Sequence, residues 1–171
     1  MVQFNNAVIF MASLAAFAQG YVIPAGLENG VYEVRLNETG HLHPYYVGPG
    51  ATTSSSLPRD VGRAALQARD QHGCTAHTLN SGDCDAAVNS LRSFCGGGKR
   101  YTSKIMLFTH NSVTAYTCDY SGGQLCFSSE AQTAYTQITN DCGFYRSGWW
   151  LFGSNKNYGY DVQGASICGN L

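Results

Sequence analysis

The sequence predicts an α+β domain: an antiparallel sheet of about four strands with two helices packed on one face, stapled by disulfides. Three observations favour this class. Two stretches have the apolar period of a helix, four others have the composition of strands, and all seven cysteines lie between Cys74 and Cys168. These elements follow one another as helix, hairpin, helix and hairpin, which is typical of helices packed on an antiparallel sheet.

Composition divides the chain into three segments. Residues 1–18 contain the apolar run 7–18, which is too short to span a membrane and predicts a secretory signal peptide cut after Ala18. Residues 19–70 hold one candidate strand at 31–36 and then a stretch rich in Pro, Ser and Thr, so we interpret them as a spacer or a removable pro-segment. Residues 71–171 form the cysteine-rich α+β domain. We therefore expect a secreted, extracellular protein whose thiols are oxidised.

Two short motifs concern the processing of an exported chain. Asn37 begins an Asn-Glu-Thr sequon, which predicts a glycosylated surface loop. Lys99 and Arg100 form the one dibasic pair of the sequence, and we interpret it as a solvated loop rather than a cleavage site.

The first helix is expected within residues 83–98, where three glycines end it. Its apolar face recurs at spacings of four, three and four residues: Cys84, Val88, Leu91 and Cys95. Asn80 or Ser81 can cap its start, and Gly96 can end it in the left-handed conformation. The two cysteines lie about 16 Å apart on a helix. Because they cannot bond to each other, we expect each to bond a different partner.

The remaining elements follow the same logic. The helical spacing recurs within residues 129–143, at Ala131, Tyr135, Ile138 and Cys142. Ser129 and Gln132 fit a capping box at the start of that helix. Residues 104–109 and 113–118 predict one hairpin, residues 149–152 and 158–162 predict two further strands, and residues 165–168 can tie the tail back into the sheet.

The cysteines predict three disulfides and one odd thiol. The candidates are Cys74, Cys84, Cys95, Cys118, Cys126, Cys142 and Cys168. Their pairing stays open, because six cysteines alone allow about 15 connectivities. Cys74 precedes the first helix and is our candidate for the odd cysteine. An odd thiol in an oxidising space suggests an intermolecular disulfide or a reactive group.

The sequence also offers candidates for metal and thiol chemistry. His72, Cys74 and His77 form an H-x-C-x-x-H cluster, which would need a fourth ligand such as His110 to bind zinc. Zinc requires reduced thiols, so in an exported chain we favour disulfide formation. A Cys–His nucleophile pair has no local signature to support it. We therefore expect no metal and no cofactor.

A small secreted ribonuclease is the most concrete enzymatic alternative. Such chemistry needs a base, an acid and a cation around a phosphate. Glu130, His77 or His110, and Arg146 supply these residue types. Charged residues make up 12% of the chain and its net charge is -1, which excludes a nucleic-acid binder that works by bulk electrostatics.

Trp149 and Trp150 are adjacent, so on a strand their side chains face opposite sides of the sheet. One is then expected in the core, and the other on a candidate binding surface near Tyr145. An exposed tryptophan with neighbouring tyrosines would also suit a third class of protein, a carbohydrate-binding or cell-wall module.

Two groups of residues resemble a known family. The run from Leu79 to Cys84, followed by a helix and a cysteine, resembles the start of fungal necrosis-inducing secreted effector domains. The C-terminal part resembles them as well, in Cys142-Gly143, Ser147-Gly148-Trp149, Tyr158-Gly159-Tyr160 and Ile167-Cys168-Gly169-Asn170. More distantly, the chain is similar to the small killer toxins of fungi, which are disulfide-bonded α/β sandwiches. The resemblance covers roughly Cys74 to the C-terminus; the seventh cysteine and the long N-terminal spacer depart from it.

The resemblance implies a non-enzymatic secreted protein that acts on a host or a competing organism, and it transfers no catalytic residues. We therefore expect a cysteine-rich effector or toxin-like protein that binds an extracellular protein or a cell-surface target. In this interpretation it has no membrane span and does not bind nucleic acid. The alternative is a small extracellular hydrolase, most concretely the ribonuclease.

Overall fold

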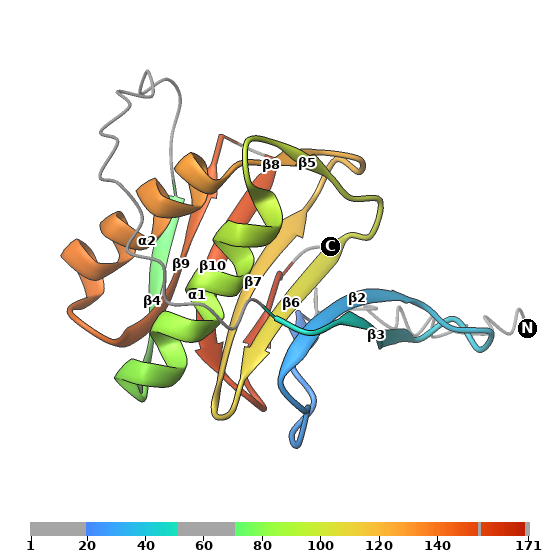
Figure 1. The fold of residues 1–171 in the computed structure, drawn as a ribbon, viewed down its shortest axis with the longest axis horizontal. Coiled ribbons are helices and arrows are strands. Elements are labelled where there is room, and N and C mark those ends of the chain that lie inside the picture. Colours follow the sequence, from blue (N-terminus) through green and yellow to red (C-terminus); the bar gives the residue numbers. More distant parts are fainter. Residues whose placement is uncertain (1–19, 51–70, 154, 170–171) are drawn as a thin grey trace, which may run out of the picture.

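The computed structural model describes residues 20–50, 71–153 and 155–169 (Figure 1). The main sheet has the spatial order β3 (Leu42–Gly48), β2 (Gly30–Leu36), β6 (Ile105–His110), β7 (Val113–Asp119), β10 (Lys156–Val162), β9 (Arg146–Phe152) and β4 (Gln71–Thr78), and every neighbouring pair is antiparallel. Two helices, α1 (Ser81–Cys95) and α2 (Ser128–Cys142), pack side by side on one face of this sheet (Figure 1). Two small sheets pair β1 (Tyr21–Val22) with β11 (Ser166–Ile167), and β5 (Lys99–Arg100) with β8 (Leu125–Cys126).

The predicted α+β class is confirmed, but the main sheet has seven strands instead of about four. The two unpredicted strands of the main sheet are its edges, β3 and β4. Pro44 lies within β3, where an edge strand tolerates the missing N–H group. Gln71–Thr78 is polar and largely exposed, so it lacks the alternation of a half-buried strand. Residues 19–70 were interpreted as a spacer with one strand, but their described part, residues 20–50, contains three: β1, β2 and β3.

Both helices form where their apolar period predicts them. Asn80 caps α1, because its Oδ1 accepts the backbone N–H of Asp83 at 3.1 Å. Gly96 ends α1 with a positive φ, and its N–H donates to the carbonyl of Arg92. The capping box at the start of α2 is not formed: no side chain caps that end, and Gln132 instead donates to Thr136 one turn further along the helix.

The core has two layers, one on each face of the main sheet. On the helix side, Leu91 and Ile138 pack with strand residues such as Phe108 and Tyr158. On the other side, Ile23, which directly follows β1, and Ile167 of β11 cover part of the main sheet. We call this second side, which the helices leave free, the open face.

Three disulfides join the layers, and they correct two predictions. Cys74 bonds Cys142, Cys95 bonds Cys126 and Cys118 bonds Cys168. The prediction that Cys74 is the odd cysteine was therefore wrong, and so was the expectation that both cysteines of α1 form disulfides. Cys84 is the free one: it is buried in the layer between α1 and the sheet, so an intermolecular disulfide would require it to leave the core.

Within the described ranges, no helix is long and apolar enough to cross a membrane. The predicted signal peptide, residues 1–18, lies outside the described residues, and so does most of the Pro/Ser/Thr-rich stretch.

Candidate functional site

The open face carries a row of alternating aromatic and glycine residues, which the strand register creates. Tyr116 of β7 pairs with Gly159 of β10, which pairs with Trp149 of β9, which in turn pairs with Gly73 of β4. Directly paired residues of antiparallel neighbours point to the same face. The row therefore runs across four strands of the sheet.

The two glycines let the two rings lie close over the strand backbone. A Cβ atom at Gly159 would lie 2.4 Å from the ring of Tyr116, and one at Gly73 would lie 2.7 Å from Nε1 of Trp149. Any other residue at either position would push the neighbouring ring away. We call the four residues Tyr116, Gly159, Trp149 and Gly73 the aromatic floor.

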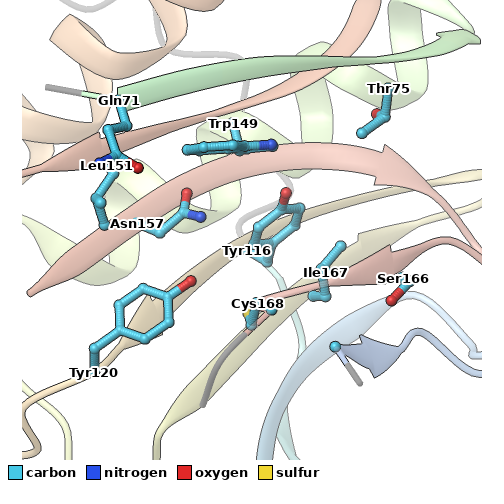
Figure 2. A pocket seen from close by; sticks show the side chains of 12 residues that line it. Gln71, Thr75, Tyr116, Tyr120, Trp149, Leu151, Asn157, Ser166, Ile167 and Cys168 are labelled. Carbon is cyan, nitrogen blue, oxygen red and sulfur yellow. The ribbon is translucent and has the colours of Figure 1, made fainter. Parts of the chain in front are cut away.

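A pocket of about 630 Å³ opens beside this floor (Figure 2). Trp149, Tyr116 and Asn157 line it from the main sheet, and Ile167 and Cys168 line it from the tail. The Cys118–Cys168 disulfide fixes that tail to β7, so the bridge holds one wall of the pocket in place. The volume lies in the usual range of small-molecule sites.

The described residues that line the pocket are all uncharged. They are two glycines, two aliphatic residues, one disulfide-bonded cysteine, three aromatic residues, two amides, one serine and one threonine. Burial raises the pKa of Tyr116 well above its usual value and also raises that of Tyr120, although a hydrogen bond with Asn157 opposes the second shift. Both phenols therefore stay protonated at neutral pH and can donate hydrogen bonds.

Asn157 has an unmet hydrogen-bonding group in this pocket. The residue is 5% exposed and its side chain is hydrogen-bonded to Tyr120, but Oδ1 has no partner among the described residues. Figure 2 shows the amide between Leu151, Trp149 and Tyr116. A buried acceptor without a partner is unfavourable, and a water or a ligand hydroxyl that reached it would satisfy it.

A polar cluster, which we define as Thr75, His77, Ser147 and Asp161, lies next to the pocket and shares Thr75 with it. The Asp161 side chain is 1% exposed and accepts a hydrogen bond from Thr75 Oγ1 at 2.6 Å. His77 Nδ1 lies 2.7 Å from Asp161 Oδ1, while 49% of the His77 side chain is exposed. Ser147 Oγ accepts the backbone N–H of His77 at 3.0 Å. The buried carboxylate therefore orients an accessible imidazole.

Of the four residues of the ribonuclease hypothesis, His77 alone lies in this cluster. Glu130, in the first turn of α2, accepts hydrogen bonds from Lys156 and from Tyr158. Tyr158 belongs to the core layer on the helix side of the sheet, opposite the open face.

The other two residues also have local partners. Arg146 donates to Thr78 Oγ1 and to the carbonyl of Ala76, and His110 Nδ1 lies 3.4 Å from Asp83. Among the described residues, no hydrogen bond or ion pair joins Glu130, Arg146 or His110 to His77.

The residues of the H-x-C-x-x-H cluster point to separate partners. Cys74 is oxidised, His72 lies 3.3 Å from Asp141 and stacks on Trp150, and His77 contacts Asp161. In the part of the chain that the structure describes, no three metal-ligating side chains come together.

The candidate binding surface of Trp149, Trp150 and Tyr145 is divided between the two sides of the sheet. Trp149 is half-buried and lines the pocket, whereas Trp150 is buried under the helices. The Tyr145 hydroxyl approaches Asp85 of α1 at 3.4 Å, so it also lies on the helix side.

Sequence reasoning missed Tyr116, Asn157 and Asp161. One signal was present: Asn157, Gly159 and Asp161 alternate with the aromatic residues of the same strand. A period of two places them together on one face.

Asn37 and Lys99-Arg100 lie away from the pocket. Asn37 is at the β2–β3 turn, where its Oδ1 accepts the N–H groups of Thr39 and His41; its glycosylation stays a prediction. Lys99 and Arg100 form the exposed strand β5.

No protein-family model, no curated protein and no solved structure gives a significant match to this chain. The resemblance to fungal effectors therefore stays a prediction, and the function must be argued from the geometry.

Proposed function

We propose that this chain is a secreted, disulfide-stapled protein of the effector or toxin type, which acts by binding a target at the surface of a host or competing cell. The single observation that carries the proposal is the pocket on the open face, with its aromatic floor and uncharged walls. Three disulfides support the extracellular location, because such bonds persist in oxidising compartments.

The chemistry of the pocket favours binding over catalysis. A general acid or base needs a titratable group within reach of the reacting atoms. The described lining offers only tyrosine hydroxyls, whose pKa values are raised by burial in Tyr116 and Tyr120. An accessible tryptophan beside buried hydroxyl and amide groups is instead what a recognition site requires.

The test compares two aromatic truncations in the full chain, secreted from a eukaryotic host. Intact mass with and without reduction verifies three bridges, and fluorescently labelled protein is then titrated onto candidate target cells. We expect Trp149→Ala to weaken cell binding at least tenfold. Phe144→Ala is the matched control, because Phe144 is 82% exposed and does not line the pocket. Equal binding by wild type and Trp149→Ala, or failure to find the protein in the medium, would contradict the proposal.

One contact favours the second candidate, an extracellular hydrolase: the pair formed by His77 and the buried Asp161. A carboxylate that orients a half-exposed imidazole is a common arrangement for a general base. For the ribonuclease form, the purified protein should degrade single-stranded RNA, and His77→Gln should abolish the cleavage. RNA that stays intact at micromolar protein would exclude this form.

A further inference from the structure

We propose that the pocket on the open face binds a neutral carbohydrate, namely an uncharged oligosaccharide of pyranose rings. This inference rests on the proposed binding function and names the chemical class of the ligand. Four features of the pocket support it: the floor, the unmet acceptor, the character of the polar groups and the absence of charge in the described lining.

The accessible part of the aromatic floor is Trp149, because Tyr116 is only 2% exposed. Trp149 is half-buried, so one part of its indole faces the pocket while its Nε1 edge lies over Gly73. The Tyr116 ring lies over Gly159, and its hydroxyl is directed toward Trp149 (Figure 2). The C–H face of a pyranose ring is apolar and flat, and it packs well on such a surface.

The unmet acceptor calls for a hydroxyl or amide donor. Asn157 Oδ1 is buried without a partner, and the Asn157 amide also contacts the Tyr120 hydroxyl. A sugar hydroxyl both donates and accepts, so it can satisfy this amide in either orientation of its oxygen and nitrogen. An aliphatic ligand would leave the amide unpaired, which disfavours a lipid chain.

The other polar groups share this dual character. Gln71, Tyr120 and Ser166 line the pocket with an amide or a hydroxyl each, and each of these groups can donate and accept. A polyhydroxylated ring presents the same mixture of donors and acceptors around its edge. The lining therefore complements many hydroxyls at once, whereas a single planar base would use only a few of these groups.

Charge separates a neutral sugar from its competitors. A phosphate or carboxylate ligand would enter a pocket whose described lining offers no Lys, Arg or His side chain to compensate its charge. A cationic ligand would lack a carboxylate in the same lining. The nearby Asp161 is already engaged with His77 and Thr75. A neutral ligand therefore has the smallest cost of desolvation on entering this pocket.

The experiment is a calorimetric and NMR titration of the disulfide-bonded secreted protein with four soluble probes. Three are neutral: oligomers of β-1,3-linked glucose, of N-acetylglucosamine and of mannose. The fourth, an oligomer of galacturonic acid, is the charged counterpart. We expect at least one neutral probe to bind and the acidic probe to bind at least tenfold more weakly. The resonance of the Trp149 indole N–H should shift on binding, while that of the buried Trp150 should not.

Three variants decide whether the pocket is responsible. Trp149→Ala and Asn157→Leu should each reduce the affinity about tenfold or more, because they remove the stacking surface and the unmet acceptor. Phe144→Ala should leave the affinity unchanged, and thermal unfolding with an intact-mass check shows which variants are folded. If a variant is unfolded, Trp149→Phe and Asn157→Ser provide milder changes of the same groups.

The outcomes separate this inference from the proposed function. If no neutral probe binds at millimolar concentration but Trp149→Ala still loses cell binding, the protein binds cells through the open face and the carbohydrate assignment is wrong. If a neutral probe binds through Trp149 but cells are not bound, the assignment stands and the effector function is wrong. Sugar binding that survives both Trp149→Ala and Asn157→Leu would overturn the inference.

Discussion

Asp83 links the start of helix α1 to the β6–β7 turn. Its carboxylate accepts hydrogen bonds from Asn111 Nδ2 at 2.8 Å and from Ser112 Oγ at 2.7 Å, and His110 lies beside it. Burial raises the pKa of Asp83, but the hydrogen bonds outweigh this effect and leave the pKa below its usual value. The ionised side chain therefore stabilises the folded state more than the unfolded state.

We predict that this contribution is lost in acid. Because the folded pKa is depressed, the stabilisation is complete above the unfolded pKa, near 3.9, and disappears as the pH falls through the folded pKa. Asp83→Asn should lower the midpoint of urea unfolding at pH 7, and the difference from wild type should shrink toward pH 2. Urea unfolding at several pH values, with Asp85→Asn as an exposed control on the same helix, measures this. A difference that does not depend on pH would contradict the assignment.

The sequence could predict some features of the individual site residues and not others. Two adjacent tryptophans on a strand must face opposite sides, and Trp149 and Trp150 do so. Which of the two lies in a pocket depends on the placement of the helices, and that is a tertiary property. The unmet Oδ1 of Asn157 likewise depends on neighbours from β7 and the tail.

At the scale of elements, β9 and β10 are joined by more than backbone hydrogen bonds. The paired Gly159 and Trp149, with Tyr116 on the next strand, form a surface in which each ring occupies the space above a glycine. The close fit means that these strands admit almost no side-chain volume at the glycine positions.

We predict that Gly159→Ala is strongly destabilising. The new Cβ would lie 2.4 Å from the Tyr116 ring and 2.8 Å from the carbonyl of Gly148, so the fully buried ring must shift. Overpacking of this kind costs about 1–3 kcal/mol. Gly97→Ala is the matched control, because nothing lies within 4 Å of its new Cβ. Urea unfolding compares the two, and a Gly159→Ala variant as stable as Gly97→Ala would show that the floor is loosely packed.

The helices could be predicted and the edge strands could not, for a physical reason. Helices α1 and α2 bury one stripe each, so their apolar period is visible in the sequence. The edge strand β3 has a proline and mostly exposed side chains, and β4 is polar. Their pairing depends on the free edges of β2 and β9, which no local pattern encodes.

At the scale of the molecule, the N-terminal residues belong to the fold. Ile23 and Val34 are buried to 0% and 1% exposure, and β2 pairs with β6 over five residues. Together they cover Ile105 and Leu107 on the open face. Residues 20–50 contain no cysteine, so they are held by packing and strand pairing and not by disulfides.

We predict that the cysteine-rich region is not stable without this segment. Each buried aliphatic side chain contributes about 1.5–3 kcal/mol, and the whole stability of a small domain is about 5–15 kcal/mol. A chain that starts at Gln71 should therefore melt at a much lower temperature than one that starts at Gln19, or fail to unfold cooperatively. Circular dichroism melting of both chains, with all three disulfides verified by mass, makes the comparison. Equal melting temperatures would mean that residues 19–70 can be removed without harm.

The disulfide pairing could not be derived from the sequence for a related reason. The helical spacing placed Cys84 and Cys95 on one face of α1, and both do face the core. Which of them meets a partner depends on the position of β8, whose Cys126 lies at the C-terminal end of α1 and bonds Cys95. The other two disulfides join cysteines that lie 68 and 50 positions apart in the sequence, and only the tertiary fold brings them together.

The Cys118–Cys168 bridge has a consequence for where the protein can work. It attaches the chain end that walls the pocket to a central strand of the sheet, while β11 itself pairs with β1 over only two residues. Reduction of this bridge would leave the wall held by that short pairing and by the packing of the buried Ile167. We therefore expect the proposed ligand binding to weaken under reducing conditions such as those of the cytosol, because packing and a short strand pairing alone would then hold this wall.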